Sequence, residues 1–304
     1  MKKARYISIV FTLLLCIAFS SCACNNANDV SQSNTTFQKV IKEADKYTTS
    51  KEIDCEYDSN TKTLFVMGNG PMSKNAKKLW MTGSVNKELL LKVENLIICK
   101  GLTSICDNAF DDGIYGDEYI GKNGFRKLKN VFISDTVKSI GERAFYNCAG
   151  LENVVIPDSV EKLGESAFEL CSKLNNVTIP ENVKEIPERL FCSCDKMENV
   201  TIGNSVEIIG EDAFYLTSLK SINIPDSVTT IESGAFFFTD IYKIKIPASV
   251  IKIGENALGY GADLKTDYEA MGNYENKNFT IEGYKGTAAE KYAKDNEFKF
   301  VALD

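Results

Sequence analysis

The sequence predicts a repeat solenoid, mainly β, made of about seven stacked units of 22–23 residues. An isoleucine recurs just before the proline position of each unit, at intervals of 23, 23, 23, 22 and 22 residues: Ile133, Ile156, Ile179, Ile202, Ile224 and Ile246. A period held this closely is typical of stacked supersecondary units. A single unit would leave its apolar side chains in water, whereas a stack buries them between neighbours.

Each unit opens with a strand. Val154 and Ile156 alternate with Asn153 and Val155, which is the period of two expected of a half-buried strand. Pro157 follows and has no N–H to donate, so the strand ladder ends there and the chain turns.

The rest of the unit predicts a return path to the next strand. Val160 and Leu163 point inward as a second short strand or arc, and Gly164 allows a tight bend. Phe168 then lies on a helical or 3₁₀ turn and fills the interior, and Leu174 leads into the next unit. Burial of these apolar side chains contributes about 25 cal/mol per Å².

Residues 151–171 resemble the BspA-type leucine-rich repeat of bacterial surface proteins almost position by position, and the resemblance extends over 97–264. The flanking caps are also similar to those of that family. The resemblance implies an extracellular binding or adhesion role. Four residues depart from the repeat pattern at positions where repeats vary: Cys99 for proline, Cys106 for glycine, Pro187 for glycine and Leu258 for phenylalanine.

The N-terminus predicts secretion. Residues 1–21 combine a basic start with a short apolar stretch, as a signal peptide does. Cys22 follows Phe19, Ser20 and Ser21, which resembles the lipid-modification site of bacterial lipoproteins and implies anchoring on the outer face of the bacterial cell membrane. Cys24 is a second candidate, and secretion with an unmodified Cys22 is the alternative.

Three further segments flank or interrupt the repeats. Residues 22–50 are a polar tether with a weak helical pattern over 37–47. Residues 51–96 are the expected N-terminal cap, with a hairpin over 53–68 and a segment around Trp80. The repeats over 97–264 carry a 12-residue insert within 111–127.

Residues 265–304 are the expected C-terminal cap, with a β-α-β-like order of elements. Thr287 and Glu290 form a capping-box pattern at the start of its helix. Asn296 marks the end of that helix.

The composition argues against several functions. The chain has 304 residues and a net charge of −7, and this negative charge argues against nucleic acid as a partner. It has no histidine, which excludes Ser-His-Asp and Cys-His nucleophile systems. No pattern indicates a cofactor, a metal site or a catalytic residue. We expect a monomer that is attached to the membrane through its lipid anchor and binds an extracellular protein or glycan.

Ten cysteines invite a disulfide or metal hypothesis. Cys148, Cys171 and Cys194 recur every 23 residues, each three residues after a phenylalanine. Side chains stacked in register stay about 4.8 Å apart, which is wider than a disulfide prefers. We therefore favour a column of small buried thiols.

Two surfaces are candidates for binding. The alternation predicts an outward polar sheet face that grades from neutral to basic and comprises Asn130, Phe132, Asn153, Val155, Asn176, Thr178, Asn199, Thr201, Ser221, Asn223, Lys243 and Lys245. The insert offers a candidate binding loop with Tyr115, Asp117, Tyr119 and Phe125. The alternatives are that the polar face serves only solubility and that the insert is a tolerated solvated loop.

The leading hypothesis is a non-catalytic, lipid-anchored surface protein that binds host or microbial extracellular proteins through its solenoid. A polysaccharide-binding lipoprotein of a nutrient-capture system is the alternative. Exposed aromatic residues on the sheet face would favour the glycan, and only Phe132 qualifies. An enzyme is the third hypothesis, and clustered carboxylates in one concave pocket would support it.

Overall fold

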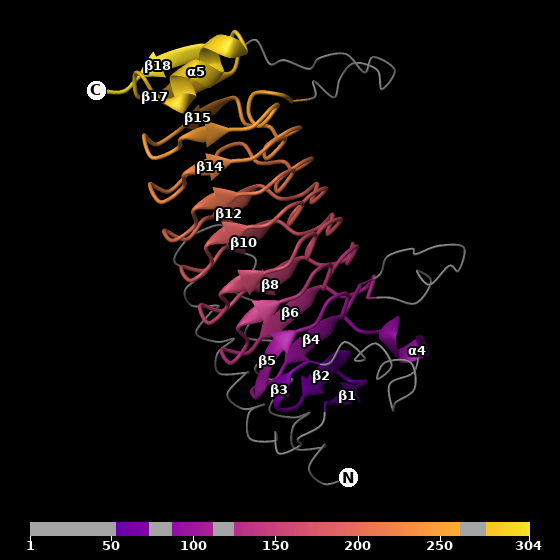
Figure 1. Ribbon diagram of the computed structural model, residues 1–304. Helices are drawn as coiled ribbons and strands as arrows, with labels where there is room; N and C mark the ends of the chain where they lie inside the picture. The colour runs from indigo at the N-terminus through magenta and orange to yellow at the C-terminus, as the bar shows by residue number, and fades with distance from the viewer. Residues whose placement is uncertain (1–52, 73–86, 112–124, 262–277) are drawn as a thin grey trace, which may run out of the picture.

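The computed structural model describes residues 53–72, 87–111, 125–261 and 278–304. The chain winds into an elongated stack of coils, with β1 (Asp54–Asp58) at one end and α5 (Ala288–Asp295) at the other (Figure 1). Most coils add one short strand to each of two ladders, although residues 221–223 form none and the hydrogen-bonded pairing is interrupted along each ladder. The structure is therefore the mainly β solenoid that the period predicted.

The first ladder forms one side of the stack. It contains β1, β2 (Thr63–Met67), β4 (Asn95–Ile98), β6 (Asn130–Ile133), β8 (Asn153–Val155), β10 (Asn176–Thr178), β12 (Asn199–Thr201), β15 (Lys243–Lys245), β17 (Thr280–Gly283) and β18 (Lys299–Ala302). Strands β1 and β2 form the predicted antiparallel hairpin, and all later pairings in this ladder are parallel. Equivalent residues of successive repeats therefore lie side by side, as with Asn176 and Asn199.

The second ladder contains β3 (Gly70–Pro71), β5 (Leu102–Ile105), β7 (Ser139–Ile140), β9 (Lys162–Leu163), β11 (Glu185–Ile186), β13 (Ile208–Ile209), β14 (Thr230–Ile231) and β16 (Lys252–Ile253). Its pairings are parallel throughout. The second short strand predicted around Leu163 is thus confirmed, and its inward residues meet those of the first ladder in one core.

Two helices are described, α4 (Lys87–Leu90) and α5. Helix α5 ends at the predicted Asn296 cap. Its N-terminus differs from the expected capping box, because Thr287 donates to the carbonyl of Tyr284 and Glu290 accepts from the N–H of Gly286. In the described part of the chain no helix is long and apolar enough to cross a membrane.

Six phenylalanines form a column through the interior, one for each repeat: Phe110, Phe145, Phe168, Phe191, Phe214 and Phe236. Neighbouring rings are stacked with centroids 5.2–5.8 Å apart. Offset-stacked aromatic pairs contribute about 0.5–1.5 kcal/mol beyond the area they bury. Leu258 takes the place of the phenylalanine in the last repeat, and the Tyr292 hydroxyl bonds to both its backbone N–H and its carbonyl oxygen at 3.1 Å.

The cysteine column lies beside the phenylalanines. The thiols of Cys148, Cys171 and Cys194 are fully buried and donate to carbonyl oxygens of the preceding repeat at 3.2–3.3 Å. Cys171 and Cys194 are free thiols. Thr217 and Thr239 occupy the same position in the later repeats and donate to their own repeat's phenylalanine carbonyl. The predicted column of small buried thiols is confirmed for these residues.

Burial makes this column sensitive to alkali. It raises the pKa of the Cys171 and Cys194 thiols well above their ordinary value, and the neighbouring thiol of the column adds to the shift. Thiols in an unfolded chain ionise at about pH 8.5. The contribution of the two buried thiols to the free energy of unfolding is therefore complete below that pH and is lost as the pH rises above it. We expect the free energy of unfolding to fall by about 1.4 kcal/mol per pH unit for each thiol between about pH 9 and 10.5.

Denaturant unfolding followed by circular dichroism at pH 7–10.5 measures this loss. The matched variant is Cys171→Thr/Cys194→Thr, because threonine already occupies the column at Thr217 and Thr239. The variant should lose less stability on going to alkaline pH than the parent chain. Equal pH dependence in the two proteins would show that these thiols do not titrate on unfolding.

Candidate binding face

The first ladder has one side in the core and one side turned away from it. Val131, Val154 and Val177 belong to the hydrophobic core, so Asn130, Asn153 and Asn176, one residue earlier on each strand, point the other way. We call this outward side the sheet face. It runs along the whole stack and carries most of the residues predicted for binding.

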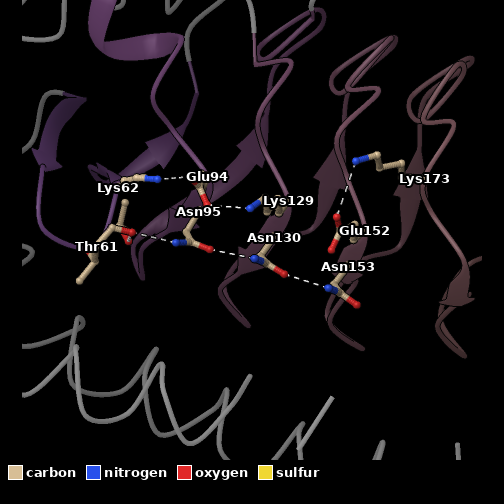
Figure 2. A network of polar contacts seen from close by, with 10 residues as sticks. Thr61, Lys62, Glu94, Asn95, Lys129, Asn130, Glu152, Asn153 and Lys173 are labelled. Atoms are coloured by element: carbon tan, nitrogen blue, oxygen red, sulfur yellow. Dashed lines mark hydrogen bonds and ion pairs between the residues drawn. The ribbon is translucent and has the colours of Figure 1, made fainter. Parts of the chain in front are cut away.

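A row of side-chain amides follows one edge of the sheet face. Asn95 donates from Nδ2 to the carbonyl of Thr61 at 3.0 Å, Asn130 donates to Asn95 at 2.8 Å, and Asn153 donates to Asn130 at 2.9 Å (Figure 2). Asn199 donates to Asn176 at 2.9 Å in the same way. Parallel in-register pairing produces this row because it sets equivalent amides one strand spacing apart.

An ionic row lies directly before the first three of these strands, at the residue that precedes each asparagine, and sequence reasoning missed it. Glu94 pairs with Lys62 and with Lys129, the latter at 2.9 Å, while Lys173 lies 4.0 Å from Glu152 (Figure 2). Hydrogen bonds from Lys62, the larger cause, and from Lys129 lower the pKa of the Glu94 carboxyl. The sequence signal is the alternating charge of Glu94, Lys129 and Glu152, each of which directly precedes an asparagine of the row.

The accessible part of the sheet face lies in its middle and C-terminal repeats. Asn153 and Val155 are half-buried. The other predicted residues beyond them are exposed: Asn176, Thr178, Asn199, Thr201, Ser221, Asn223, Lys243 and Lys245.

Two predicted contact residues are not accessible. Asn130 is 6% exposed and Phe132 is 3% exposed, so the expectation that both could meet a ligand is wrong. Asn130 is held within the amide row between Asn95 and Asn153. Phe132 lies between Ile97 and Val155 in register. The alternation predicts the side of the sheet on which Phe132 lies, but it does not predict that the ring is buried.

The predicted binding loop is corrected in one residue. Phe125 is 2% exposed and packs edge-on against Phe110, with ring centroids 5.2 Å apart, so it belongs to the core. Tyr115, Asp117 and Tyr119 lie outside the described residues, as does the predicted lipidation residue Cys22.

The basic C-terminal end of the sheet face is partly neutralised. Lys243 pairs with Glu282 at 2.6 Å, and Lys245 lies opposite Glu282 in the β15–β17 pairing. Strands β17 and β18 extend the sheet face into the C-terminal cap, with Thr280 beside Lys299 in register. Sequence reasoning placed these strands in the cap without assigning them to this surface.

One ion pair of the described repeats involves a buried carboxylate. Glu169 is a buried carboxylate, and Arg189 holds it with hydrogen bonds of 2.8 and 3.3 Å. The same contact raises the pKa of the Arg189 guanidinium. Within the described ranges no group of three or more cysteine or acidic residues is placed to hold a metal ion.

The chain resembles known leucine-rich repeat proteins. The sequence pattern described as "BspA type Leucine rich repeat region" matches residues 138–265 in six copies. No curated protein matches the sequence.

Three solved structures are similar in fold, and each covers most of this chain. A leucine-rich cell surface protein from Faecalibacterium prausnitzii A2-165 is 22% identical and covers 68% of this chain and 72% of its own, with a TM-score of 0.35. The T. pallidum leucine-rich repeat protein is 17% identical over 84% and 99%, with a TM-score of 0.46. A leucine-rich repeat protein from Bacteroides ovatus ATCC 8483 is 20% identical over 85% and 76%, with a TM-score of 0.49.

Proposed function

Because residues 138–265 match the BspA-type leucine-rich repeat pattern in six copies, we propose that this chain is a non-catalytic surface protein that binds an extracellular protein through its sheet face. The observation that carries the proposal is that the polar residues of β10, β12 and β15, and Ser221 and Asn223 in the coil between β12 and β15, are all exposed. Repeat proteins use such extended surfaces to bind partners.

The chemistry of this surface suits a protein ligand. Asn176 and Asn199 present amide groups, and Thr178 and Thr201 present hydroxyls, all in register on neighbouring strands. Amides and hydroxyls both donate and accept hydrogen bonds, so the surface can pair with exposed peptide groups. Phe132, the aromatic residue that would have favoured a glycan, is buried.

The cellular location is part of the proposal. A signal peptide over 1–21 and lipid modification of Cys22 would place the solenoid outside the cell, with residues 22–50 as its tether. The two acyl chains of a diacylated cysteine suffice for stable anchoring. The solenoid would then present its sheet face to soluble or cell-bound partners.

The test is binding of the chain from residue 23 onward to paired arrays of extracellular-matrix proteins and glycans. The variant Asn176→Arg/Asn199→Arg places two guanidinium groups on the exposed amide row. We expect protein binding to weaken by about tenfold or more, because a charge buried without a partner costs at least ~1.4 kcal/mol. Circular dichroism checks that the variant folds.

The matched control is Asn182→Arg/Asn204→Arg, which makes the same chemical change at two exposed asparagines of the turns. Binding retained by the control and lost by the sheet-face variant supports the proposal. Equal binding by both variants places the ligand elsewhere and overturns it. Binding to glycans alone would support the polysaccharide-binding alternative.

A further inference from the structure

The C-terminal end of the sheet face is rich in lysine. Lys243 and Lys245 lie on β15, and Lys299 lies two strands further along, on β18. Lys220 precedes the equivalent coil of the repeat before β15, and all four lysines are exposed. Within the described strands β15, β17 and β18, the one acidic residue is Glu282.

The positive charge of this end is mostly unpaired. Glu282 binds Lys243 at 2.6 Å, although it lies opposite Lys245 in register. Lys220, Lys245 and Lys299 form no ion pair with any residue of the described ranges. This part of the surface is therefore positive, while the whole chain carries a net charge of −7.

The lysines are close enough to act together on a ligand. Strand geometry sets the Cα atoms of Lys243 and Lys245 about 7 Å apart, and those of Lys243 and Lys299 about 10 Å apart. These separations are close to the Debye length of about 8 Å at physiological salt. An approaching negative group therefore feels the field of several lysines at once.

An exposed tyrosine lies at the edge of this positive region. Tyr242 is 66% exposed and directly precedes Lys243. Its carbonyl oxygen accepts a hydrogen bond from the N–H of Thr280 at 3.0 Å, which ties its backbone to β17. No other aromatic side chain of the described ranges is exposed. The alternation within β15 did not predict this exposure, because Tyr242 lies before the strand.

These features suit an acidic protein segment better than a glycan. Aspartate and glutamate side chains supply the negative charge that complements unpaired lysines. A single tyrosine is a frequent anchor of protein interfaces, because its ring packs on apolar groups and its hydroxyl forms hydrogen bonds. A row of exposed rings would instead favour a polysaccharide, and Tyr242 has no exposed aromatic neighbour among the described residues.

We propose that the basic end of the sheet face, formed by Lys220, Tyr242, Lys243, Lys245 and Lys299, binds an acidic segment of the extracellular protein partner. This inference rests on the proposed function and adds the charge of the partner. Carboxylates of the segment pair with the lysines that lack an ion pair, and an apolar side chain packs on the ring of Tyr242. The amide row then meets an uncharged part of the same partner.

Binding of the full chain to immobilised poly-L-glutamate, followed by biolayer interferometry, tests the charge. Lys245→Glu/Lys299→Glu reverses two charges of the basic end, and binding should weaken about tenfold or more. Lys92→Glu/Lys162→Glu makes the same change in net charge at two exposed lysines outside the basic end, and its effect should stay below about twofold. Circular dichroism checks that both variants fold. Equal effects of the two variants, or no binding by the parent chain, overturn the proposal.

The tyrosine is tested with the protein ligands that the extracellular-matrix array identifies. Tyr242→Ala should weaken their binding about fivefold or more, as expected of an interface anchor. Tyr242→Phe keeps the ring and should weaken binding less than about twofold. Equal losses in the two variants would contradict packing on the ring.

Two further outcomes separate this inference from the proposed function. Array proteins that lose binding to Asn176→Arg/Asn199→Arg but keep it with Lys245→Glu/Lys299→Glu would leave the sheet face as the binding surface and overturn the acidic segment. Alginate, an acidic polysaccharide, is the second immobilised probe. Binding to alginate as tight as binding to poly-L-glutamate, or tighter, would overturn the choice of a protein segment.

Discussion

Replacing Phe168 with alanine is expected to lower the free energy of unfolding by about 3–5 kcal/mol. Its ring is fully buried and stacks on Phe145 at 5.2 Å and on Phe191 at 5.7 Å. Alanine would leave a cavity shared by three successive repeats, and the two neighbouring rings would each lose a stacking partner. Denaturant unfolding followed by circular dichroism measures the loss.

Phe168→Leu is the matched control, since leucine already holds this position in the last repeat as Leu258. Leucine fills much of the space without a stacking ring, so a loss of about 1–2 kcal/mol is expected. Similar losses for the alanine and leucine variants would mean that filled volume contributes little and that stacking accounts for the effect. A loss below about 1 kcal/mol for alanine would contradict the central role of the column.

Replacing Gly164 with alanine is expected to cost about 1–3 kcal/mol for a different reason. A Cβ at Gly164 would lie 2.3 Å from the backbone nitrogen of Glu142 and 2.4 Å from the carbonyl carbon of Gly141. Both atoms belong to the backbone of the preceding repeat, so no side-chain rotation relieves the contact. The two repeats must move apart locally, and the ladder pairing of β7 with β9 weakens.

The thermal midpoint of unfolding measures this cost, with Glu165→Ala as the control. Glu165 is the next residue and is exposed, so its truncation should change stability by less than about 0.5 kcal/mol. If the Gly164→Ala variant is as stable as the Glu165→Ala control, the backbones of the two repeats can separate there at little cost.

Most of the fold could be predicted from the sequence because every repeat carries a similar pattern of inward apolar and outward polar residues. The alternation of Asn153, Val154 and Val155 fixed the inward side, and the burial of Val154 confirms it. The phenylalanine and cysteine columns followed from the period in the same way. A departure such as Leu258 in place of phenylalanine does not obscure the pattern, because the other repeats show which residue type this position holds.

The candidate site was less predictable, because alternation assigns a side of the sheet and says nothing of what packs upon it. Phe132 is outward as expected and yet buried. Phe125 follows a glycine-rich stretch that predicts a loop, but it packs on Phe110. The equivalents of Phe132 in later repeats, Thr178 and Thr201, are exposed, and Phe125 belongs to an insert that the other repeats lack, so no neighbouring unit supplies a second example of either burial.

The side-chain amides of the row also align their dipoles along the sheet face. In each pair, the asparagine of the later repeat donates to an oxygen of the earlier one, from Asn153 back to Thr61 and from Asn199 to Asn176. The side-chain dipoles therefore point the same way and polarise one another. Their negative ends, the Oδ1 atoms, point toward the C-terminal repeats, and Asn199 at that end of the row is exposed. If the sheet face binds a ligand as proposed, these aligned dipoles would favour one of the two directions in which the ligand could lie along the row.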